Sequence, residues 1–385
     1  MPLPVRILSF VVFLGLSGVM VVYLYRRLVR DVTQKRTIRI GGGVLMIGVV
    51  SAALAARTVL RGSSMNQYVA VFLGLWIALL LYTLLSLIIV DLARWGSGMR
   101  RKDPAPINPE RRAFLSRAVA GSSLISGGAL ASWGVFRAYE PARIHEVTVR
   151  LAGLPKSLEG FTIAQLSDLH IGAVLQQKFV DDLVSRTNGF KPDLVAITGD
   201  LVDGKPAEIG GFVSRLGGLQ SRMGTYFVSG NHDHYAGWDE WSAYLTGMGV
   251  KVLKNQRVVI GDPGGSFDLL GVEDLGSRLV RTGYDLDLAA QGRDPARATV
   301  LMSHQPGGFD DAVRLGIGLQ LSGHTHGGQT FPATGVASLI WGARATGLSR
   351  EGTSQLFTSR GCGFVGPPIR LGSPSEIIKI VLLPG

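Results

Sequence analysis

Residues 193–203 read DLVAITGDLVD, and this stretch decides the fold of the larger part of the chain. Its first six residues have the length and the apolar composition of a buried β-strand, and the polar cluster GDLVD follows directly. Functional groups gather outside the carboxyl ends of strands in α/β sheets. The stretch therefore predicts a strand of such a sheet, with Asp200 and Asp203 at a functional edge.

Four further apolar runs end in polar clusters in the same way. From about Arg143 to the end of the chain, such β-rich runs alternate with helical patterns, which is typical of an α/β domain. The runs and their clusters are 161–166 before Ser167-Asp168-Leu169-His170, 225–229 before Gly230-Asn231-His232-Asp233, 298–302 before Ser303-His304, and 318–322 before Gly323-His324-Thr325-His326.

The histidines concentrate at these strand ends. A lone histidine is usually structural, but six of the seven lie in or beside the clusters, together with Asp and Asn. Imidazole and carboxylate without thiolate suit Mn, Fe, Zn or Co. The single cysteine, Cys362, excludes a disulfide framework and a Cys-based zinc site. The donors outnumber the ligands of one four-coordinate ion, so the sequence predicts two adjacent divalent metal ions, an arrangement that hydrolyses phosphoesters.

The five clusters, taken in order, resemble the five blocks of the calcineurin-like metallophosphoesterases. The string GHTHGGQ at 323–329, with the tail at 359–372, is similar to one bacterial branch of membrane-associated or exported phosphoesterases, some linked to cleavage of UDP-2,3-diacylglucosamine. The resemblance covers residues 143–385. It implies a four-layer α/β/β/α sandwich and a metal-dependent phosphoester or pyrophosphate hydrolase.

The resemblance also implies a role for each polar side chain. Asp200 would bridge the two metal ions, His232 would stabilise or protonate the leaving group, and Asp203 would orient His232. The metals would lower the pKa of a bridging water, and the resulting hydroxide would attack phosphorus in line with the leaving oxygen. The other implied ligands are Asp168, His170 and His326 for the first metal, and Asn231, His304 and His324 for the second.

Other residues near the clusters are expected to have structural roles. Asp233 is expected to fix its loop, and capping of a turn is the alternative role of Asp203. His145 and His234 are expected to be structural, with a substrate contact as the alternative for His234. Cys362 is expected to be a packed residue rather than a nucleophile.

Two positions depart from the blocks of the Ser/Thr protein phosphatases, which carry Arg after GDxxD and Glu after GNH. This chain has Gly204 and Asp233 at these positions. It therefore lacks the phosphate-binding arginine that a protein phosphatase would need, which disfavours that interpretation. The residue that would replace this arginine stays open among four candidates, Arg344, Arg350, Arg360 and Arg370.

Two apolar segments are candidates for the wall of a substrate pocket. In the segment 237–245, Trp238, Trp241 and Leu245 share one helical face. That face is expected to pack on the sheet, and an aromatic lip over an acyl chain or at the membrane interface is the alternative. The second candidate is 331–348, which is expected to be a loop and contains Leu339, Ile340 and Trp341.

The first 136 residues differ in composition from the rest. They hold 16 Lys or Arg against 4 Asp or Glu, a net charge of +12, whereas residues 137–385 hold 23 against 24, a net charge of −1. A nucleic-acid binder would carry this excess on its folded domain, so nucleic acid is not expected as a partner. Hydrophobic residues make up 46% of the chain, which excludes a disordered chain. Four uncharged stretches are long enough to span a bilayer, at 7–25, 40–56, 68–90 and 118–136.

The loops between these stretches alternate in charge. Residues 26–39 and 94–112 each contain six Lys or Arg, whereas Arg57 and Arg61 are the only two in the intervening loop. Basic loops stay cytoplasmic, which places the N-terminus outside. If the fourth stretch crosses, residues after Phe136 lie outside the cytoplasm; a peripheral or buried helix is the alternative. The motif at 111–116, RRAFLS, resembles a twin-arginine export signal, with an ordinary basic cluster beside the membrane as the alternative.

The sequence thus predicts an all-α multi-span membrane anchor before an α/β domain. Residues 1–92 would hold three transmembrane helices, 93–142 a basic linker and the fourth membrane segment, and 143–385 the phosphoesterase domain. The expected place is the inner or plasma membrane, multi-pass, with an extracytoplasmic catalytic domain. The expected partners are the bilayer and a lipid-linked or envelope phosphoester, which implies a role in lipid metabolism. The alternatives are a UDP-2,3-diacylglucosamine-type pyrophosphatase at the cytoplasmic face and a non-catalytic membrane sensor.

Overall fold

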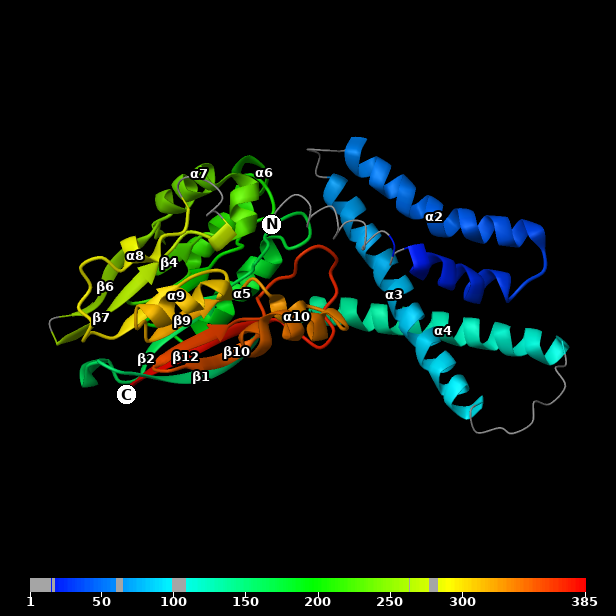
Figure 1. The fold of residues 1–385 in the computed structure, drawn as a ribbon. Helices are drawn as coiled ribbons and strands as arrows, with labels where there is room; N and C mark the ends of the chain where they lie inside the picture. The colour runs from blue at the N-terminus through cyan, green and yellow to red at the C-terminus, as the bar shows by residue number, and fades with distance from the viewer. Residues whose placement is uncertain (1–14, 16–17, 60–64, 99–108, 263, 277–282) are drawn as a thin grey trace. The chain divides into compact units, whose positions relative to one another are not determined.

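The structure is a computed structural model, and it describes residues 15, 18–59, 65–98, 109–262, 264–276 and 283–385. The chain divides into two compact units, Met1–Val135 and Phe136–Gly385. The boundary falls inside the long helix α4 (Pro109–Ala138), near its C-terminal end (Figure 1). Each unit is described by itself below.

The described part of the first unit is helical except at 31–35, where a turn joins two helical segments. It contains a short π-helical turn, η1 (Arg26–Arg30), followed by α2 (Arg36–Val59), α3 (Met65–Gly98) and most of α4. Leu24, Met46, Leu80 and Leu87 form a small buried cluster. Beside it, Asp91 on α3 accepts hydrogen bonds of 2.6 Å from both Tyr23 and Arg27. The charge of Asp91 is therefore paired rather than left alone in an apolar helix.

Two helices of the described part are long and apolar enough to cross a membrane, at Val71–Ser97 and Pro109–Ala138. They coincide with the predicted stretches 68–90 and 118–136. The predicted span 40–56 lies in α2, but several side chains of that helix lie outside the described residues, as does most of 7–25. Those two spans stay predictions, and so does the multi-pass topology.

The second unit contains two six-stranded sheets of mixed direction. In the first sheet, β2, β3, β4 and β5 run parallel, and β12 runs antiparallel to β2 and parallel to β1. In spatial order its strands are β1 (Arg143–Leu151), β12 (Glu376–Pro384), β2 (Phe161–Leu166), β3 (Leu194–Thr198), β4 (Thr225–Val228) and β5 (Lys251–Val252).

The second sheet has four parallel central strands and an antiparallel strand at each edge. In spatial order its strands are β10 (Gly347–Glu351), β11 (Ser354–Thr358), β9 (Leu319–Ser322), β8 (Thr299–Met302), β7 (Gly265–Gly271) and β6 (Gln256–Asp262). The five predicted runs are all strands, with bounds within a residue of those expected.

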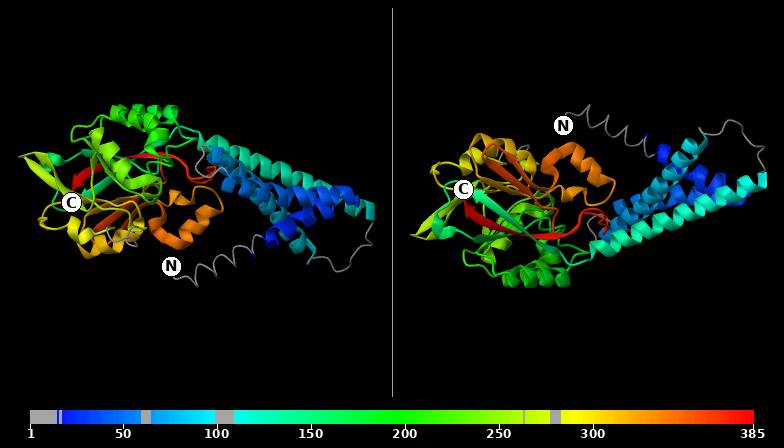
Figure 2. Two further views of the ribbon diagram at one scale, coloured as in Figure 1. Left: turned by 90° about the horizontal axis from the view of Figure 1, so that it is seen from above. Right: turned by 90° about the horizontal axis from the view of Figure 1, so that it is seen from below.

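The two sheets face each other, and helices cover their outer sides (Figure 2). Alternate residues of the strands, such as Ile163 on β2 and Val300 on β8, share one core between the sheets. The opposite faces pack on helices, with Ile197 against Val180 on one side and Leu301 against Phe309 on the other. The covering helices are α5 (Gln177–Gly189), α6 (Pro206–Val213) and α7 (Asn231–Gly247) for the first sheet, and α8 (Leu286–Ala289) and α9 (Phe309–Arg314) for the second.

This layering is the four-layer α/β/β/α sandwich that the family resemblance implies. One further helix, α10 (Ala333–Trp341), lies in the segment 331–348 that is expected to be a loop, so that expectation is wrong for these residues. The helix buries none of its residues. The remaining elements are single 3₁₀ turns: η2 (Lys156–Leu158), η3 (Ser214–Gly218), η5 (Pro306–Gly308), η6 (His326–Gly328) and η7 (Gly342–Ala345).

Candidate metal centre

The side chains predicted as metal ligands come together at the carboxyl ends of five strands. Asp168 and His170 follow β2, and Asp200 follows β3. The first sheet also supplies Asn231 after β4, and the second sheet supplies His304, His324 and His326 after β8 and β9. Because these strands run parallel within each sheet, their carboxyl ends meet at one edge of the sandwich.

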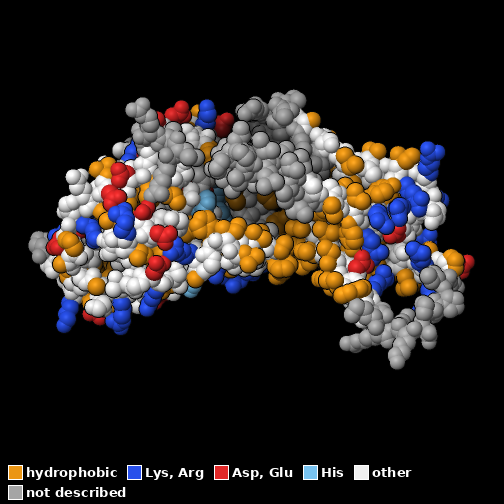
Figure 3. All heavy atoms as spheres, viewed as in Figure 1, with side chains coloured by type: hydrophobic (Ala, Val, Ile, Leu, Met, Phe, Trp, Pro, Cys, Tyr) orange, Lys and Arg blue, Asp and Glu red, His pale blue; other side chains and the backbone are white. Residues whose placement is uncertain are grey.

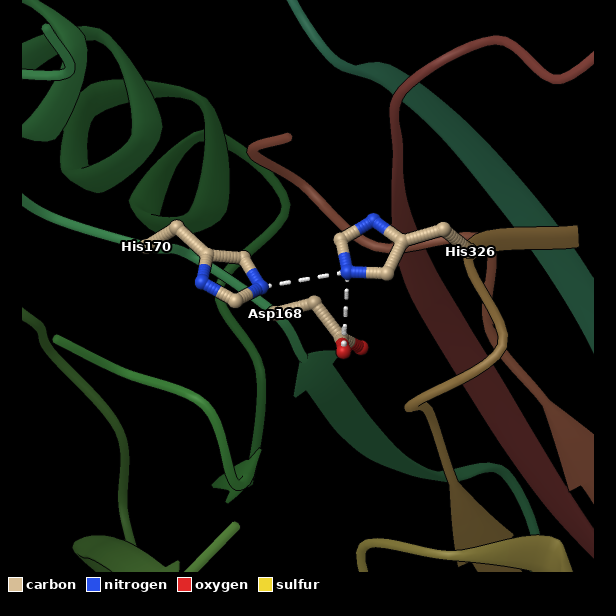
Figure 4. A group of neighbouring side chains, drawn as sticks. All are labelled: Asp168, His170 and His326. Carbon is tan, nitrogen blue, oxygen red and sulfur yellow. Dashed lines mark hydrogen bonds and ion pairs between the residues drawn. The ribbon is translucent and has the colours of Figure 1, made fainter. Parts of the chain in front are cut away.

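Asp168, His170 and His326 form a first group, called here the closed group because all three side chains are buried. They point toward one another (Figure 4). Nε2 of His170 lies 3.1 Å from Nε2 of His326, which lies 3.3 Å from Oδ1 of Asp168. Two facing imidazole nitrogens share at most one proton, whereas a divalent cation accepts a lone pair from each of them.

His304 and His324 form a second group beside Asp200. The family resemblance adds Asn231 to this group, which is called the open group because Asn231 and His324 are partly exposed. Nδ1 of His324 lies 3.3 Å from Nε2 of His304. Nδ1 of His304 donates to the carbonyl of Thr198 at 2.9 Å, which leaves the lone pair of its Nε2 free for a ligand. Oδ1 of Asn231 is buried and has no hydrogen-bond partner. A buried acceptor without a donor fits a site for a cation.

Asp200 lies between the two groups. Its Oδ2 is 3.8 Å from Nε2 of His170 in the closed group and 3.3 Å from Nε2 of His304 in the open group. Its Oδ1 accepts the backbone N–H of His232 at 2.8 Å, which fixes the carboxylate plane. The residues present therefore fit two adjacent divalent ions that share one carboxylate.

The backbone at the centre is strained. Positive φ values are found at five predicted ligands, with φ of 54° at Asp168, 47° at His170, 51° at Asp200, 69° at His324 and 49° at His326. Residues with a Cβ rarely adopt this conformation, and clusters of such strain mark functional sites. Gly199 also has a positive φ, of 89°, and a Cβ there would lie 2.6 Å from Nδ1 of His304. The strands thus end in tight turns that aim the donors at one another.

Asp203 holds two imidazoles with one oxygen. Its Oδ1 lies 3.1 Å from Nδ1 of His170 and 2.7 Å from Nδ1 of His232. The side chain of His232 keeps 28% of its surface exposed. His232 also lies near His170 and Asp200, so geometry alone allows it as a metal ligand. Its predicted role toward the leaving group rests on the family resemblance and on this exposure.

The carboxylates make the centre attractive to cations. Burial disfavours charged imidazole, but Asp203 and Asp200 outweigh it and raise the pKa of His170 to about 9. In the same way Asp200 and Asp168 outweigh burial and raise the pKa of His304 to about 10. Two protons therefore occupy the metal-free centre where cations would bind.

The pKa values of two other groups at the centre, His324 and Asp203, are lowered. Burial and the charge of His304 lower the pKa of His324 to about 4. Burial raises the pKa of Asp203, but His170 and His232 outweigh it and hold that pKa well below the ordinary value. Asp203 therefore remains a carboxylate that accepts from both imidazoles.

The structure also confirms the predicted structural residues. Asp233 accepts backbone N–H groups of Gly230, Asp200 and Leu201 at 2.7–2.9 Å, so it fixes the two loops. His234 contacts the hydroxyl of Ser229 at 3.1 Å. His145 lies 3.8 Å from the carboxylate of Glu376 on an exposed strand face. Cys362 is buried, and burial raises the pKa of its thiol to about 12, which excludes it as a nucleophile.

Of the four candidate arginines, two form ion pairs with acidic side chains and one contacts a predicted metal ligand. Arg344 pairs with Asp310 and Glu351, and Arg360 with Glu376. Arg370 is buried and donates to backbone carbonyls, and its Nη2 lies 3.3 Å from Nδ1 of His326. Arg370 therefore supports the closed group rather than replacing a phosphate-binding arginine, and Arg350 has no resolved role.

The two candidate apolar segments differ. In α7, Trp241 and Leu245 are buried and Trp238 packs beside them with its indole N–H bound to Glu273, so the predicted packing is confirmed. In the second segment, the ring of Trp341 lies edge-on to that of His324, with centroids 6.2 Å apart. Only the second segment reaches the centre with an aromatic side chain.

Sequence reasoning missed one acidic residue near the centre. Asp274 is buried and accepts from Nε2 of Gln305 at 2.9 Å, next to His304. Its charge also raises the pKa of His304. A signal existed, because Glu273 and Asp274 follow the apolar strand β7 just as the other clusters follow their strands.

Comparison with known proteins agrees with this geometry. Residues 161–328 match the family described as calcineurin-like phosphoesterase. Two relatives are called "Transmembrane protein with metallophosphoesterase domain". The protein of Danio rerio is 34% identical over 270 residues, which cover 68% of this chain and 62% of the relative. The protein of Bos taurus is 36% identical over 262 residues, which cover 65% of this chain and 59% of the relative. An uncharacterized metallophosphoesterase of Helicobacter pylori is 34% identical over 253 residues, covering 65% and 66%.

The chain thus matches about three fifths to two thirds of the length of these relatives. The matched part contains the five strand-end clusters and both donor groups described above. The α/β unit of this chain belongs to the calcineurin-like metallophosphoesterase family, whose members use two divalent metal ions.

Proposed function

We propose that this chain is a membrane-anchored phosphoesterase that hydrolyses a phosphoester or pyrophosphate bond with the help of two divalent metal ions. The observation that carries the proposal is the position of Asp200, whose Oδ2 lies within 3.8 Å of a histidine of each donor group. Asp168, His170 and His326 would hold one ion, and Asn231, His304 and His324 the other. Mn, Fe, Zn and Co all suit these donors.

Bound metal ions would supply two kinds of chemistry: they lower the pKa of coordinated water and they neutralise charge on the phosphoryl oxygens. The chain's own residues determine where this happens. Asp200 keeps the donor groups adjacent, while Asp168 also accepts the backbone N–H of His324 at 2.9 Å and so links the closed group to the open group. The substrate phosphorus would be held on the open side, where Asn231 and His324 are partly exposed.

His232 and Asp203 would handle the leaving group. Asp203 accepts Nδ1–H of His232 at 2.7 Å, which directs Nε2 of this imidazole away from Asp203. A proton on Nε2 could then be donated to the departing oxygen, as in other sites where a carboxylate orients a catalytic imidazole.

The membrane part supports an envelope or lipid-linked substrate. We propose an anchor over 1–92, a basic linker with a fourth membrane segment over 93–142, and a catalytic domain over 143–385. The apolar helices at Val71–Ser97 and Pro109–Ala138 and the two transmembrane relatives support this arrangement. The basic loops favour an extracytoplasmic catalytic domain in the inner or plasma membrane.

The orientation separates this proposal from its main alternative, a UDP-2,3-diacylglucosamine-type pyrophosphatase at the cytoplasmic face. The GHTHGGQ block and the apolar Trp341 beside His324 favour a lipid-bearing pyrophosphate. Fusions of alkaline phosphatase and of green fluorescent protein to the C-terminus would test orientation in living cells. Active phosphatase with a dark fluorescent fusion supports the extracytoplasmic form, and the reverse result supports the alternative.

The experiment that tests hydrolysis is the substitution Asp200→Asn in the full chain, loaded with Mn²⁺. Turnover of bis-p-nitrophenyl phosphate should fall by at least about 10²-fold, because the carboxylate shared by both groups loses its charge. Asp182→Asn is the matched control, since Asp182 pairs with Arg186 on the exposed side of α5 and should leave turnover unchanged. Equal turnover in the two variants would contradict the proposal and favour a non-catalytic sensor.

A further inference from the structure

Helix α10 and the residues before it form an apolar surface without cover in the described structure. Leu339 is 88% exposed and Ile340 is 70% exposed, and Phe331 and Val336 are each about half exposed. Residues 331–341 contain no charged side chain. Hydrophobic side chains gather on the surface over α10 (Figure 3). A contiguous apolar surface of this kind marks a contact with another molecule or a membrane, because its exposure to water is unfavourable.

This surface, defined by Phe331, Val336, Leu339 and Ile340, begins at the metal centre. Trp341 ends α10, and its ring lies edge-on to that of His324 in the open group, at a centroid distance of 6.2 Å. The next charged residue, Arg344, is held by Asp310 at 2.8 Å and by Glu351 at 2.7 Å. The α10 surface is therefore apolar up to the point where it meets the open group.

The short connection between α4 and β1 indicates that the apolar partner of this surface is the bilayer. Helix α4 ends at Ala138 and β1 begins at Arg143, so four residues join them, and these reach at most about 15 Å. The C-terminal end of α4 belongs to the catalytic unit, since Ala138 is buried against Phe364 and the ring of Tyr139 packs edge-on to Phe364 at 5.8 Å. A bilayer that holds α4 therefore lies within a short distance of the catalytic unit.

We propose that the α10 surface docks into the interfacial region of the bilayer that holds the membrane helices. Leu, Ile and Phe side chains insert favourably at this depth, and Trp341 suits the boundary between lipid and water. A phosphoester in a lipid headgroup would then reach the open group without leaving the bilayer. This inference rests on the membrane anchoring in the proposed function and not on hydrolysis.

A fluorescent label at Leu339 tests the docking. The full chain is reconstituted in phosphatidylcholine vesicles after Leu339→Cys and labelling with a nitrobenzoxadiazole maleimide. The native Cys362 is buried and its thiol pKa is raised to about 12, so the label goes to the new cysteine. We expect quenching by doxyl-labelled lipid. Val259→Cys is the matched control, because Val259 is 53% exposed on the edge strand β6 and should show no quenching.

A third label distinguishes failure of docking from failure of anchoring. Ile89 is 67% exposed on α3, and a label after Ile89→Cys should be quenched if this helix lies in the bilayer. Quenching at 89 without quenching at 339 would overturn the docking and leave the proposed function intact. A label at 339 shielded from aqueous iodide but not quenched by lipid would also overturn it, because a second copy of the chain would then cover α10. No quenching at 89 would overturn both the anchoring and the docking.

Discussion

The closed and open groups each contain two imidazoles and share Asp200, yet they differ in charge and in exposure. The closed group has its own carboxylate, Asp168, and all its side chains are buried. The open group has instead the neutral amide of Asn231, and two of its three side chains are partly exposed. A dedicated carboxylate in a buried site favours tight binding of a cation, whereas an exposed neutral donor leaves room for substrate. The difference predicts that one ion would be held for stability of the centre and that the other would meet the substrate.

The substitution Asp168→Asn should have the largest effect on this comparison. It removes the charge from the closed group while keeping the shape of the side chain, so the tighter of two Mn²⁺ binding steps should weaken by more than about 10²-fold. Turnover should fall with it, because Asp168 also positions His324 through its backbone N–H. Calorimetric titration of the metal-free full chain measures both steps.

Asn231→Asp is the reciprocal change. It adds a carboxylate to the open group, so it should strengthen the weaker step and bring the two affinities closer together. If Asp168→Asn leaves the tight step unchanged, or if Asn231→Asp weakens the weak step, then the assignment of the two steps to the closed and open groups is wrong.

Much of the centre could be predicted because its donors directly follow strands in the sequence. Each predicted ligand lies within a few residues of a strand end, and the pattern of apolar runs locates those ends. The carbonyl of Thr198 that orients His304 could not be predicted, because a backbone carbonyl leaves no mark in the sequence. The pairing of the strands into two sheets came from the family resemblance, since periodicity indicates an α/β domain but not the order of its strands.

Helices α7 and α10 show a second limit. Both carry large apolar side chains, but Trp241 is 1% exposed whereas Leu339 is 88% exposed. Local spacing states which residues share a face of a helix, and it does not state whether a neighbour covers that face. The fate of each face depends on the sheet and loops around it, which are far away in the sequence.

His232→Gln and Asp203→Asn should separate catalysis from metal binding. His232→Gln should lower turnover of bis-p-nitrophenyl phosphate by about 10²- to 10³-fold, since a proton donor is lost, while metal content stays at two ions. Asp203→Asn should lower turnover and also weaken the closed group by about tenfold or more, because Asp203 orients both His232 and His170.

Metal analysis of the purified variants, next to turnover, checks both expectations. Loss of an ion in His232→Gln would assign His232 to the metal centre instead. Retention of full affinity in Asp203→Asn would show that the hydrogen bond to His170 does not support the closed group.

The pH dependence of metal binding should be similar in the two groups. His170 in the closed group and His304 in the open group have pKa values raised to about 9 and about 10, so both are protonated at pH 7 in the metal-free chain. Each ion must displace one of these protons, so affinity should rise about tenfold per pH unit below the pKa and level off above it. His324, with a pKa lowered to about 4, adds no further proton at pH 7.

Calorimetry at pH 7 in two buffers of different ionisation enthalpy measures the protons released. We expect about one proton per ion. Binding without proton release would contradict the raised pKa values, and release at only one of the two steps would show that the groups differ in electrostatics as well as in exposure.

The smallest expected effect is that of Trp341→Ala, which removes the aromatic ring beside the open group. An edge-on aromatic contact contributes about 0.5–1.5 kcal/mol, so the affinity of the weaker Mn²⁺ step should change by about 2-fold to 13-fold. The tighter step should stay the same, because the residues of the closed group do not contact Trp341 through a ring pair. Trp238→Ala is the matched control, because the ring of Trp238 packs beside Phe227. Its removal should lower the free energy of unfolding but leave both metal-binding steps unchanged. An equal change in both steps after Trp341→Ala would mean that α10 supports both groups. Contact with α10 would then no longer distinguish the open group from the closed group.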